Sequence, residues 1–296
     1  MNATEKQKAI QELDRKLREV EKRLKDADLE EAFLNELRQY KGDDEIIRLG
    51  DISREDSPQR MNTGEYSFDN LLGGFGQENL VVISGPTGMG KTLFAQNITS
   101  WLSKEGYKSL WFSYELSLSE LAIRFDGLEA PEVYVPKANT SNSMLWIERK
   151  IVESIAKFNT QFVFVDHTYY LLDKGKKDNL AFEIGAIVRE LKLIARKYGI
   201  VIFLMHHTNK VEALEAPTIT DLRDSALVGN EADYVLMVWR KPFSTKPKIM
   251  LMEGINYTNE MIVSLVKNRH SGKLGTLTFV CNNFKLTNAY APTNNT

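Results

Sequence analysis

Residues 80–92 constrain the fold more than any other stretch, because an apolar run leads directly into a glycine-rich motif. The run 80–83 is typical of a buried parallel strand. It is followed by G-x-x-x-x-G-K-T, the P-loop pattern, whose glycines let backbone N–H groups surround a phosphate. The amphipathic helix predicted after it would direct its free N–H groups and positive dipole end at the same anion. The stretch therefore predicts a phosphate-binding loop between a strand and a helix.

The loop also supplies two side chains with defined chemistry. Lys91 is expected to reach the β- and γ-phosphates of a nucleotide, and the hydroxyl of Thr92 is expected to bind Mg²⁺. The predicted cofactors are therefore Mg²⁺ and ATP or another nucleoside triphosphate. The predicted nucleotide-binding residues are Gly85, Pro86, Thr87, Gly88, Met89, Gly90, Lys91 and Thr92.

Length and composition restrict the class of protein. The 296 residues are enough for one large domain plus an appendage, and 43% apolar with 26% charged residues is typical of a globular chain. The single cysteine, Cys281, excludes an internal disulfide and favours a reducing, cytoplasmic location. No apolar run is long enough to span a membrane, and none resembles a secretory signal. The net charge of −2 means that any nucleic-acid binding must come from local basic loops.

The N-terminal segment 4–40 is rich in charged residues and carries apolar side chains in an a/d pattern over three heptads. It is predicted to be helical, either lying on its own domain or packing against a neighbouring subunit or its own copy. Residues 41–62 are polar and contain helix breakers. We therefore predict a helical segment and the start of a linker over 1–48, and the main domain over 49–296.

Beyond residue 80, predicted strands and helices alternate as far as about residue 238, which predicts an α/β fold with a parallel sheet. The end of the chain differs. Two strand-like runs, 261–266 and 274–280, flank a polar turn and predict an antiparallel hairpin, with a further short strand after a turn at Asn282 and Asn283.

Polar side chains at the carboxyl ends of the predicted strands are the candidate catalytic groups, since ligands bind there in such sheets. Asp166 suits Mg²⁺ held through water, or it could cap a turn. Glu115 could orient a water that attacks the γ-phosphate, or it could be a helix cap or surface acid. His207 could bond to the γ-phosphate, or be a buried neutral histidine. Because His206 and His207 are adjacent on a strand, they point to opposite faces and are not expected to form a metal pair.

Lys267 and Arg269 stand at the entry to the predicted hairpin turn. A Lys-x-Arg sequence there could reach the γ-phosphate held by a neighbouring subunit, as an arginine finger does, or it could be two solvated charges.

Three loops after the predicted strands contain basic or polar residues at the same end of the sheet. Each alone is an ordinary solvated charge run, but together they predict a track for a phosphate backbone. The predicted DNA-binding residues in these loops are Lys174, Lys176, Lys177, Asn209, Lys210, Arg240 and Lys241.

In this order, the motifs of residues 63–281 resemble those of the RecA-like ring helicases of the DnaB and phage or mitochondrial primase–helicase family. The resemblance is carried by the P-loop, by Y-E-L-S at Glu115, by V-F-V-D-H ending at His167 and by L-M-H-H-T-N around His207. The most specific match is I-T-D-L-R-D-S, and K-N-R-H-S-G follows nearer the C-terminus. A RecA-like fold is therefore expected.

The resemblance implies roles for individual residues. Glu115 would be the catalytic base, His207 the γ-phosphate sensor, and Lys267 and Arg269 the trans-acting finger. Arg223 would lie beside DNA. Only segment 4–40 stands where the family carries a primase or primase-interacting module, and the linker helix of such rings docks on the adjacent subunit.

The expected activity is that of an Mg²⁺-dependent nucleoside triphosphatase that forms a ring, expected to be a hexamer, and moves on single-stranded DNA as a helicase. One alternative is a recombination or repair ATPase similar to RecA or RadA, since segment 71–75 resembles that branch. Another is a nucleotide-gated adaptor that binds a replisome partner through segment 4–40.

Overall fold

The computed structural model describes part of the chain. The described residues are Lys16 and residues 48–51, 60–130, 132–138, 141–172, 180–208, 216–222, 226–243 and 257–290. The chain divides into two units, residues 1–57 and 58–296. In the first unit, Lys16 is helical and η1 (Leu49–Asp51) is a short 3-10 helix. Apart from Lys16, the helix predicted over 4–40 lies outside the described residues.

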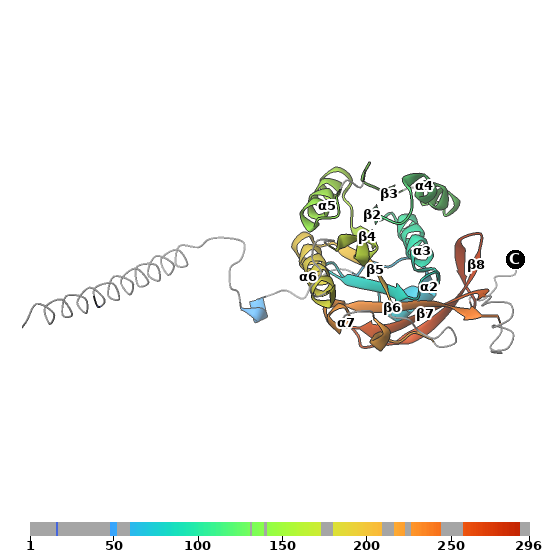
Figure 1. The fold of residues 1–296 in the computed structure, drawn as a ribbon. Coiled ribbons are helices and arrows are strands. Elements are labelled where there is room, and N and C mark those ends of the chain that lie inside the picture. The colour runs from blue at the N-terminus through green and yellow to red at the C-terminus, as the bar shows by residue number, and fades with distance from the viewer. Residues whose placement is uncertain are drawn as a thin grey trace, which may run out of the picture. The chain divides into compact units, whose positions relative to one another are not determined.

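The described strands of the second unit form one sheet with the order β3-β2-β4-β5-β1-β6-β7-β8-β9 (Figure 1). The six strands from β3 to β6 in this order pair in parallel. The last three, β7 to β9, are antiparallel additions to the β6 edge. The strands are β1 (Leu80–Gly85), β2 (Ser109–Ser113), β3 (Val133–Tyr134), β4 (Phe162–Asp166), β5 (Val201–His207), β6 (Tyr234–Pro242), β7 (Tyr257–Asn268), β8 (Gly275–Asn282) and β9 (Lys285–Asn288). The predicted α/β fold with a parallel centre and an antiparallel C-terminal hairpin is thus confirmed.

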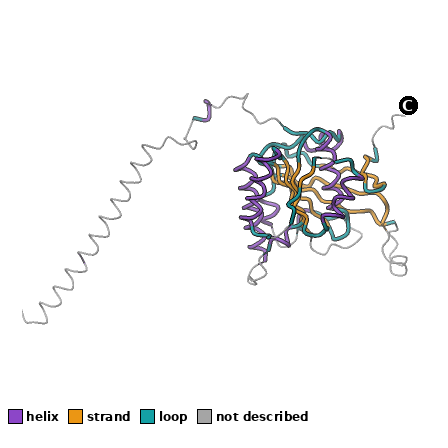
Figure 2. Tube along the Cα trace, turned by 90° about the horizontal axis from the view of Figure 1, so that it is seen from above, coloured by secondary structure: helices purple, strands orange, loops and turns teal. Residues whose placement is uncertain are grey.

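Helices cover both faces of this sheet (Figure 2). Side chains of α2, α3 and α4 pack in one apolar cluster, and those of α5, α6 and α7 pack in the other. The helices are α2 (Tyr66–Leu72), α3 (Lys91–Lys104), α4 (Leu118–Gly127), α5 (Met144–Phe158), α6 (Leu180–Tyr198) and α7 (Ala226–Glu231), with the 3-10 turns η3 (Thr168–Leu171) and η4 (Ile219–Asp221). Among the described helices, none is long and apolar enough to cross a membrane.

The helix ends follow capping signals in the sequence. Ser117 and Glu120 form a reciprocal capping box at the start of α4. The hydroxyl of Ser143 accepts a hydrogen bond from a backbone N–H in the first turn of α5. Gly73 and Asn159 end α2 and α5 in the left-handed conformation. Local chemistry therefore sets where these helices begin and end.

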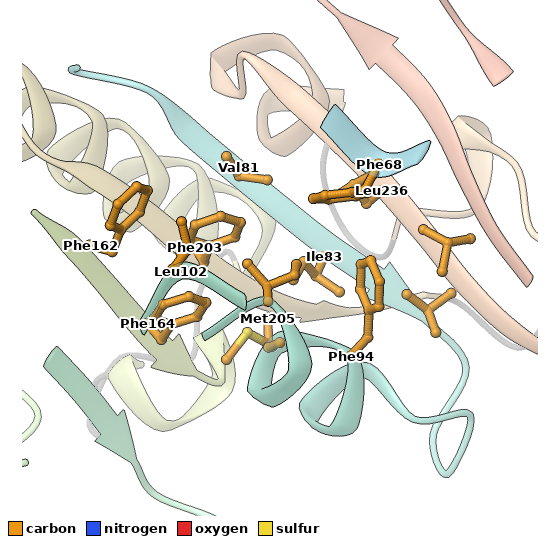
Figure 3. Close-up of a cluster of buried hydrophobic side chains, with 14 of the residues drawn as sticks. Phe68, Val81, Ile83, Phe94, Leu102, Phe162, Phe164, Phe203, Met205 and Leu236 are labelled. Atoms are coloured by element: carbon orange, nitrogen blue, oxygen red, sulfur yellow. The ribbon is translucent and has the colours of Figure 1, made fainter. Parts of the chain in front are cut away.

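Aromatic side chains link the central strands on the face covered by α3 (Figure 3). Phe164 of β4 stacks on Phe203 of β5 with ring centroids 4.5 Å apart, and on Trp111 of β2 at 4.9 Å. All three side chains are fully buried. Burial of each contributes about 2–3 kcal/mol. Together they hold β2, β4 and β5 in a fixed relative position, and these strands lead to the candidate site.

Two local expectations differ from the structure. Arg240 and Lys241 lie within β6, not in a loop after it, because β6 continues to Pro242 along its antiparallel partner β7. The turn before β9 is formed by Asn283 and Phe284, because Asn282 still pairs with Lys285 in the ladder. Both turn residues have positive φ, 47° and 65°, which is typical of a tight hairpin turn.

Candidate active site

The phosphate-binding loop connects β1 to α3 at the carboxyl edge of the sheet. Gly85 has a φ of 152°, and a Cβ atom there would lie 2.0 Å from the backbone oxygen of Val238 on β6. Gly90 directly precedes α3 with a φ of 98°. Because these conformations favour glycine, the glycines are required for the loop. The first turn of α3 starts at Lys91, directly after the loop. The N–H groups of this turn have no partner within the helix and are available to the same anion as the loop.

Lys91 is the buried cation of this loop. Its Nζ donates hydrogen bonds to the carbonyl oxygens of Gly85 at 2.9 Å and Pro86 at 3.0 Å. Burial lowers the pKa of Lys91 to about 8, while the negative charges of Asp166 and Glu115 act in the opposite direction. The amine is therefore mostly charged at pH 7 but close to its titration range, and it suits an anionic ligand.

Asp166 ends β4 and is 2% exposed. Its Oδ2 accepts a hydrogen bond from the hydroxyl of Thr92 at 2.9 Å. Burial raises the pKa of Asp166 to about 6, although the Thr92 hydrogen bond lowers it. A hydroxyl beside a carboxylate provides the hard oxygen ligands that Mg²⁺ prefers. The two residues predicted to bind the metal are therefore in direct contact.

Glu115 follows β2, and the segment that carries it is tied to β4 because the N–H of Tyr114 donates to the carbonyl oxygen of Asp166 at 3.0 Å. The N-cap of α4 is Ser117, so Glu115 does not cap that helix. The Glu115 side chain is 38% exposed, and its Oε1 lies 2.9 Å from Nε2 of His167. Glu115 thus stands beside the candidate metal ligands with its carboxylate held by a neighbouring imidazole.

His167 is buried directly after Asp166, and two contacts define its ring nitrogens. Nδ1 accepts a hydrogen bond from the backbone N–H of Tyr169 at 3.2 Å. The proton is therefore on Nε2, which donates to Glu115. Burial lowers the pKa of His167 to about 4, with a smaller contribution from the charge of Lys91. The ring is neutral at pH 7.

The two histidines that end β5 have different surroundings. His206 is fully buried, and its Nδ1 lies 3.2 Å from the hydroxyl oxygen of Thr168. His207 is partly exposed, with Nε2 3.3 Å from Nε2 of His167 and Nδ1 3.5 Å from the hydroxyl oxygen of Thr87. His207 therefore lies between the phosphate-binding loop and His167.

Within the described residues, Glu115, His167 and His207 also form a group of possible metal ligands, with one ligand atom of each within 4.8 Å of the others. The Tyr169 N–H argues against a metal at this group. A ligating Nε2 must be deprotonated, which would place the proton of a neutral His167 on Nδ1, against that backbone N–H. The hydroxyl and carboxylate of Thr92 and Asp166 are the better candidate metal ligands.

The sequence reasoning missed His167, which it named only as part of a motif. The available signal was its position directly after Asp166. Parallel strands end at one edge of the sheet, so residues that follow neighbouring strands come together. The pairing of Ser113 with Asp166, and of Val165 with Leu204, brings Glu115, His167 and His207 to one place.

Lys267 and Arg269 lie at the amino ends of the parallel strands, at the opposite end of the sheet from the phosphate-binding loop. Asn268 pairs with Tyr234 at the start of β6, and Tyr234 pairs with Val81 at the start of β1. Nζ of Lys267 donates to the carbonyl oxygens of Gly229 and Asn230 at 2.6 and 3.1 Å. Burial lowers the pKa of Lys267, and the charge of Arg269 adds to this effect.

Arg269 has similar surroundings. Its Nη1 lies 3.2 Å from Oδ1 of Asp233, and its Nη2 donates to the carbonyl oxygen of Asn230. The length of β1, about 16 Å at the usual rise per residue, separates this edge from the phosphate-binding loop. Neither cation reaches the loop of its own chain.

Two of the predicted DNA-binding residues are described. Arg240 and Lys241 lie near the carboxyl end of β6, on the same edge as the phosphate-binding loop. Nε of Arg240 donates to the carbonyl oxygen of Thr258 at 3.1 Å, whereas Lys241 is exposed. The others lie outside the described residues: Lys174, Lys176, Lys177, Asn209, Lys210 and Arg223.

The architecture and the loop define a P-loop nucleotide-binding domain with a RecA-like fold. The chain belongs to the DnaB-like helicase C-terminal domain family, whose family model matches residues 60–131 and 126–287. This confirms the family resemblance of the motifs.

The chain matches only part of each individual relative. A probable replicative DNA helicase of Trieres chinensis is 29% identical over 217 residues, which are 62% of this chain and 48% of that protein. The DNA repair protein RadA of Campylobacter jejuni is 29% identical over 183 residues, 60% of this chain and 39% of that protein. The chain thus spans about half the length, or less, of these curated relatives. The solved structure of a DnaB-like replicative helicase superposes with a TM-score of 0.65 at 18% identity, covering 86% of this chain and 70% of that one.

Proposed function

We propose that this chain is the motor of a ring-shaped DNA helicase, which hydrolyses ATP or another nucleoside triphosphate at subunit interfaces and moves on single-stranded DNA. The observation that carries the proposal is the meeting of Lys91, Thr92, Asp166 and Glu115 at the carboxyl edge of the sheet. Membership of the DnaB-like helicase C-terminal domain family supports the DNA helicase part. A ring of six subunits is part of the proposal.

The residues present fit a nucleotide phosphate and Mg²⁺. A Cβ at Gly88 would meet no atom within 4 Å, so the loop is open at that position. Lys91 and the N–H groups of the loop would bind the phosphates, and Thr92 with Asp166 would hold the metal. When bound, Mg²⁺ would neutralise charge on the phosphate oxygens.

Glu115 is the proposed general base. The oxygen of a water forms a bond to the γ-phosphorus, and the bond from that phosphorus to the bridging oxygen of the nucleoside diphosphate breaks. Glu115 accepts the proton that the water loses. His207 is the proposed sensor of the γ-phosphate, since its Nδ1 lies beside Thr87 of the loop.

Lys267 and Arg269 are proposed to act on the nucleotide of a neighbouring subunit. The support is geometric, because both lie at the sheet edge opposite their own phosphate-binding loop. In a head-to-tail ring, that edge of one chain can approach the loop of the next. An arginine supplied in this way can raise the rate of hydrolysis by ~10³ or more.

The DNA-binding residues remain a proposal that rests on charge. Lys241 is an exposed cation at the same sheet edge as the loop, and Arg240 precedes it. With the predicted basic loops, they would contact the phosphate backbone of single-stranded DNA. Arg223 would lie beside DNA by its place in I-T-D-L-R-D-S.

The remaining assignments are also proposals. Segment 1–48 would be a helical extension that docks on an adjacent subunit or a replisome partner, and 49–296 the ATPase domain. The single cysteine and the kinship with replicative helicases support a cytoplasmic location. The recombination ATPase and the adaptor are not favoured, because the matching family is that of the DnaB-like helicases.

The test combines a DNA-stimulated ATPase assay, unwinding of a forked duplex, and electron microscopy with a non-hydrolysable ATP analogue and oligo-dT. The proposal expects ring particles with the strand through the centre, and hydrolysis that is lost in Lys91→Ala. Hydrolysis that survives in Lys91→Ala, or filaments in place of rings, would contradict it.

A further inference from the structure

We propose that His167 is a positioning residue that fixes Glu115 and His207 relative to each other, an inference that rests on the proposed hydrolytic function. His167 is 7% exposed at the end of β4. Its Nε2 lies 2.9 Å from Oε1 of Glu115 and 3.3 Å from Nε2 of His207. One buried imidazole thus contacts both the carboxylate proposed to activate water and the imidazole proposed to sense the γ-phosphate.

The direction of the hydrogen bonds follows from one backbone group. The N–H of Tyr169 can only donate, so the Nδ1 of His167 that receives it at 3.2 Å carries no proton. Nε2 therefore carries it, and a carboxylate of Glu115 can accept it. The Nε2 of His207 faces the protonated Nε2 of His167 and therefore acts as an acceptor. In the neutral ring of His207 the proton is then on Nδ1. That atom is the one 3.5 Å from the hydroxyl oxygen of Thr87.

The geometry therefore gives both partners a defined orientation. Glu115 is 38% exposed, and an exposed carboxylate can adopt several rotamers unless a hydrogen bond selects one. His167 itself is held by the Tyr169 N–H and by the ring of Tyr170, whose centroid lies 4.9 Å away. A buried and fixed donor thus restrains an exposed acceptor. His167 also contacts His207, which in turn contacts Thr87 of the phosphate-binding loop, so the position of Glu115 is linked to that of the loop.

Two substitutions separate the hydrogen bond from the packing. His167→Phe keeps a planar ring against Tyr170 but removes the donor. His167→Gln places an amide N–H near the position of Nε2. We expect His167→Phe to lower the kcat of DNA-stimulated ATP hydrolysis by about 10- to 100-fold, the range for a hydrogen bond to a charged group. KM for ATP and affinity for a non-hydrolysable analogue should change by less than about 3-fold, because the phosphate-binding groups are intact.

A control and a rescue accompany this measurement. His167→Gln should recover part of the kcat that His167→Phe loses. Tyr170→Phe keeps the ring that packs on His167 and should leave kcat within about 2-fold of the unsubstituted protein. Equal losses in the Gln and Phe variants would overturn the proposal, because the amide donor of Gln would then recover none of the activity that Phe loses.

A double-mutant cycle tests whether His167 acts through Glu115. In a Glu115→Ala background, His167→Phe should cause a smaller loss of kcat than in the unsubstituted protein, since one of the two groups that His167 positions is absent. Losses that multiply in the double variant would contradict a role through Glu115.

The tautomer can be measured without any hydrolysis. The chain has four histidines, so ¹⁵N chemical shifts of the ring nitrogens can be assigned by substitution. We expect His167 as the Nε2–H tautomer, and an Nδ1–H tautomer would overturn the proposal. The two hypotheses fail differently: an unsubstituted protein without ATPase activity contradicts the proposed function, whereas an active protein with unchanged kcat in His167→Phe contradicts the positioning role.

Discussion

The hydroxyl of Thr92 donates a hydrogen bond to Oδ2 of Asp166 at 2.9 Å, which joins the first turn of α3 to the end of β4. The parallel sheet makes this contact possible, because both residues stand at its carboxyl edge. The carboxylate is buried, and its pKa is raised to about 6 by that burial. Ionisation of Asp166 is therefore unfavourable for the stability of the fold unless Lys91 or a bound metal ion compensates the negative charge.

Asp166→Asn should separate these two effects. The amide oxygen can still accept from Thr92, but it carries no charge for Mg²⁺. Hydrolysis should fall by about 100-fold or more, while the Tm without Mg²⁺ should stay the same or rise. ATPase assays across a range of Mg²⁺ concentrations and thermal unfolding in EDTA measure the two quantities. Asp126→Asn, an exposed carboxylate on α4, is the matched control, and normal hydrolysis by Asp166→Asn would refute the metal assignment.

Lys91 predicts a pH dependence of nucleotide binding. Burial lowers its pKa to about 8, so the free protein loses this positive charge as the pH rises through 8. The affinity for a non-hydrolysable ATP analogue should therefore fall by up to about 10-fold per pH unit above that value. Lys91→Arg stays charged over this range and should remove the dependence. Titration calorimetry between pH 7 and 9.5 decides, and a flat profile for the unsubstituted protein would count against the assignment.

Arg269→Ala should abolish hydrolysis while nucleotide binding persists. The guanidinium lies at the far edge of the sheet from its own loop, so only the nucleotide of a neighbour would lose a contact. We expect a fall in kcat of about 10³-fold with analogue affinity within a few-fold. Arg196→Ala, an exposed cation on α6, is the control for loss of charge. Because Arg269 also contacts Asp233, the Tm of each variant must be measured.

Mixing two inactive variants tests the shared site directly. In a mixed ring, a Lys91→Ala subunit can present its intact Arg269 to the intact loop of an Arg269→Ala subunit. Equimolar mixtures should therefore recover part of the hydrolysis that each variant lacks. Mixtures that assemble but stay inactive would indicate that both residues serve the same chain.

Gly85→Ala should disrupt the loop through steric contact. The added Cβ would lie 2.0 Å from the backbone oxygen of Val238, so β1 and β6 must separate. We expect the free energy of unfolding to fall by about 3 kcal/mol or more. We also expect nucleotide binding to be lost. Gly106→Ala has a positive φ of 84° but open space, and should cost only about 1 kcal/mol. Urea unfolding of both variants compares the two costs, and equal losses would contradict the steric explanation.

The sequence predicted the main elements because their signals are local. The apolar run before Gly85 and the glycine spacing that follows it indicate a strand, a loop and a helix without tertiary information. The pairing of Asn282 with Lys285 and the continuation of β6 to Pro242 were not predicted. Both depend on how a partner strand extends the ladder, which local composition does not report.

The candidate site was predicted as separate residues, not as a connected set. Asp166, Glu115 and His207 were each recognised from the end of an apolar run. Their connection through His167 depends on strand order and register, and on the Tyr169 N–H that selects its tautomer. The hydrophobic periodicity of the sequence predicts neither the strand pairing nor this backbone hydrogen bond. Apart from Lys16, segment 4–40 lies outside the described residues, as do most of the predicted DNA-binding residues, so those assignments stay predictions.

If Arg269 acts on a neighbour's nucleotide as proposed, its placement at the sheet end opposite its own phosphate-binding loop has a genetic consequence. In the proposed ring, one subunit lacking Arg269 would prevent hydrolysis of the nucleotide bound by an intact neighbouring subunit. A cell that expresses both versions would assemble mostly mixed rings, and the defective allele would be dominant over the normal one.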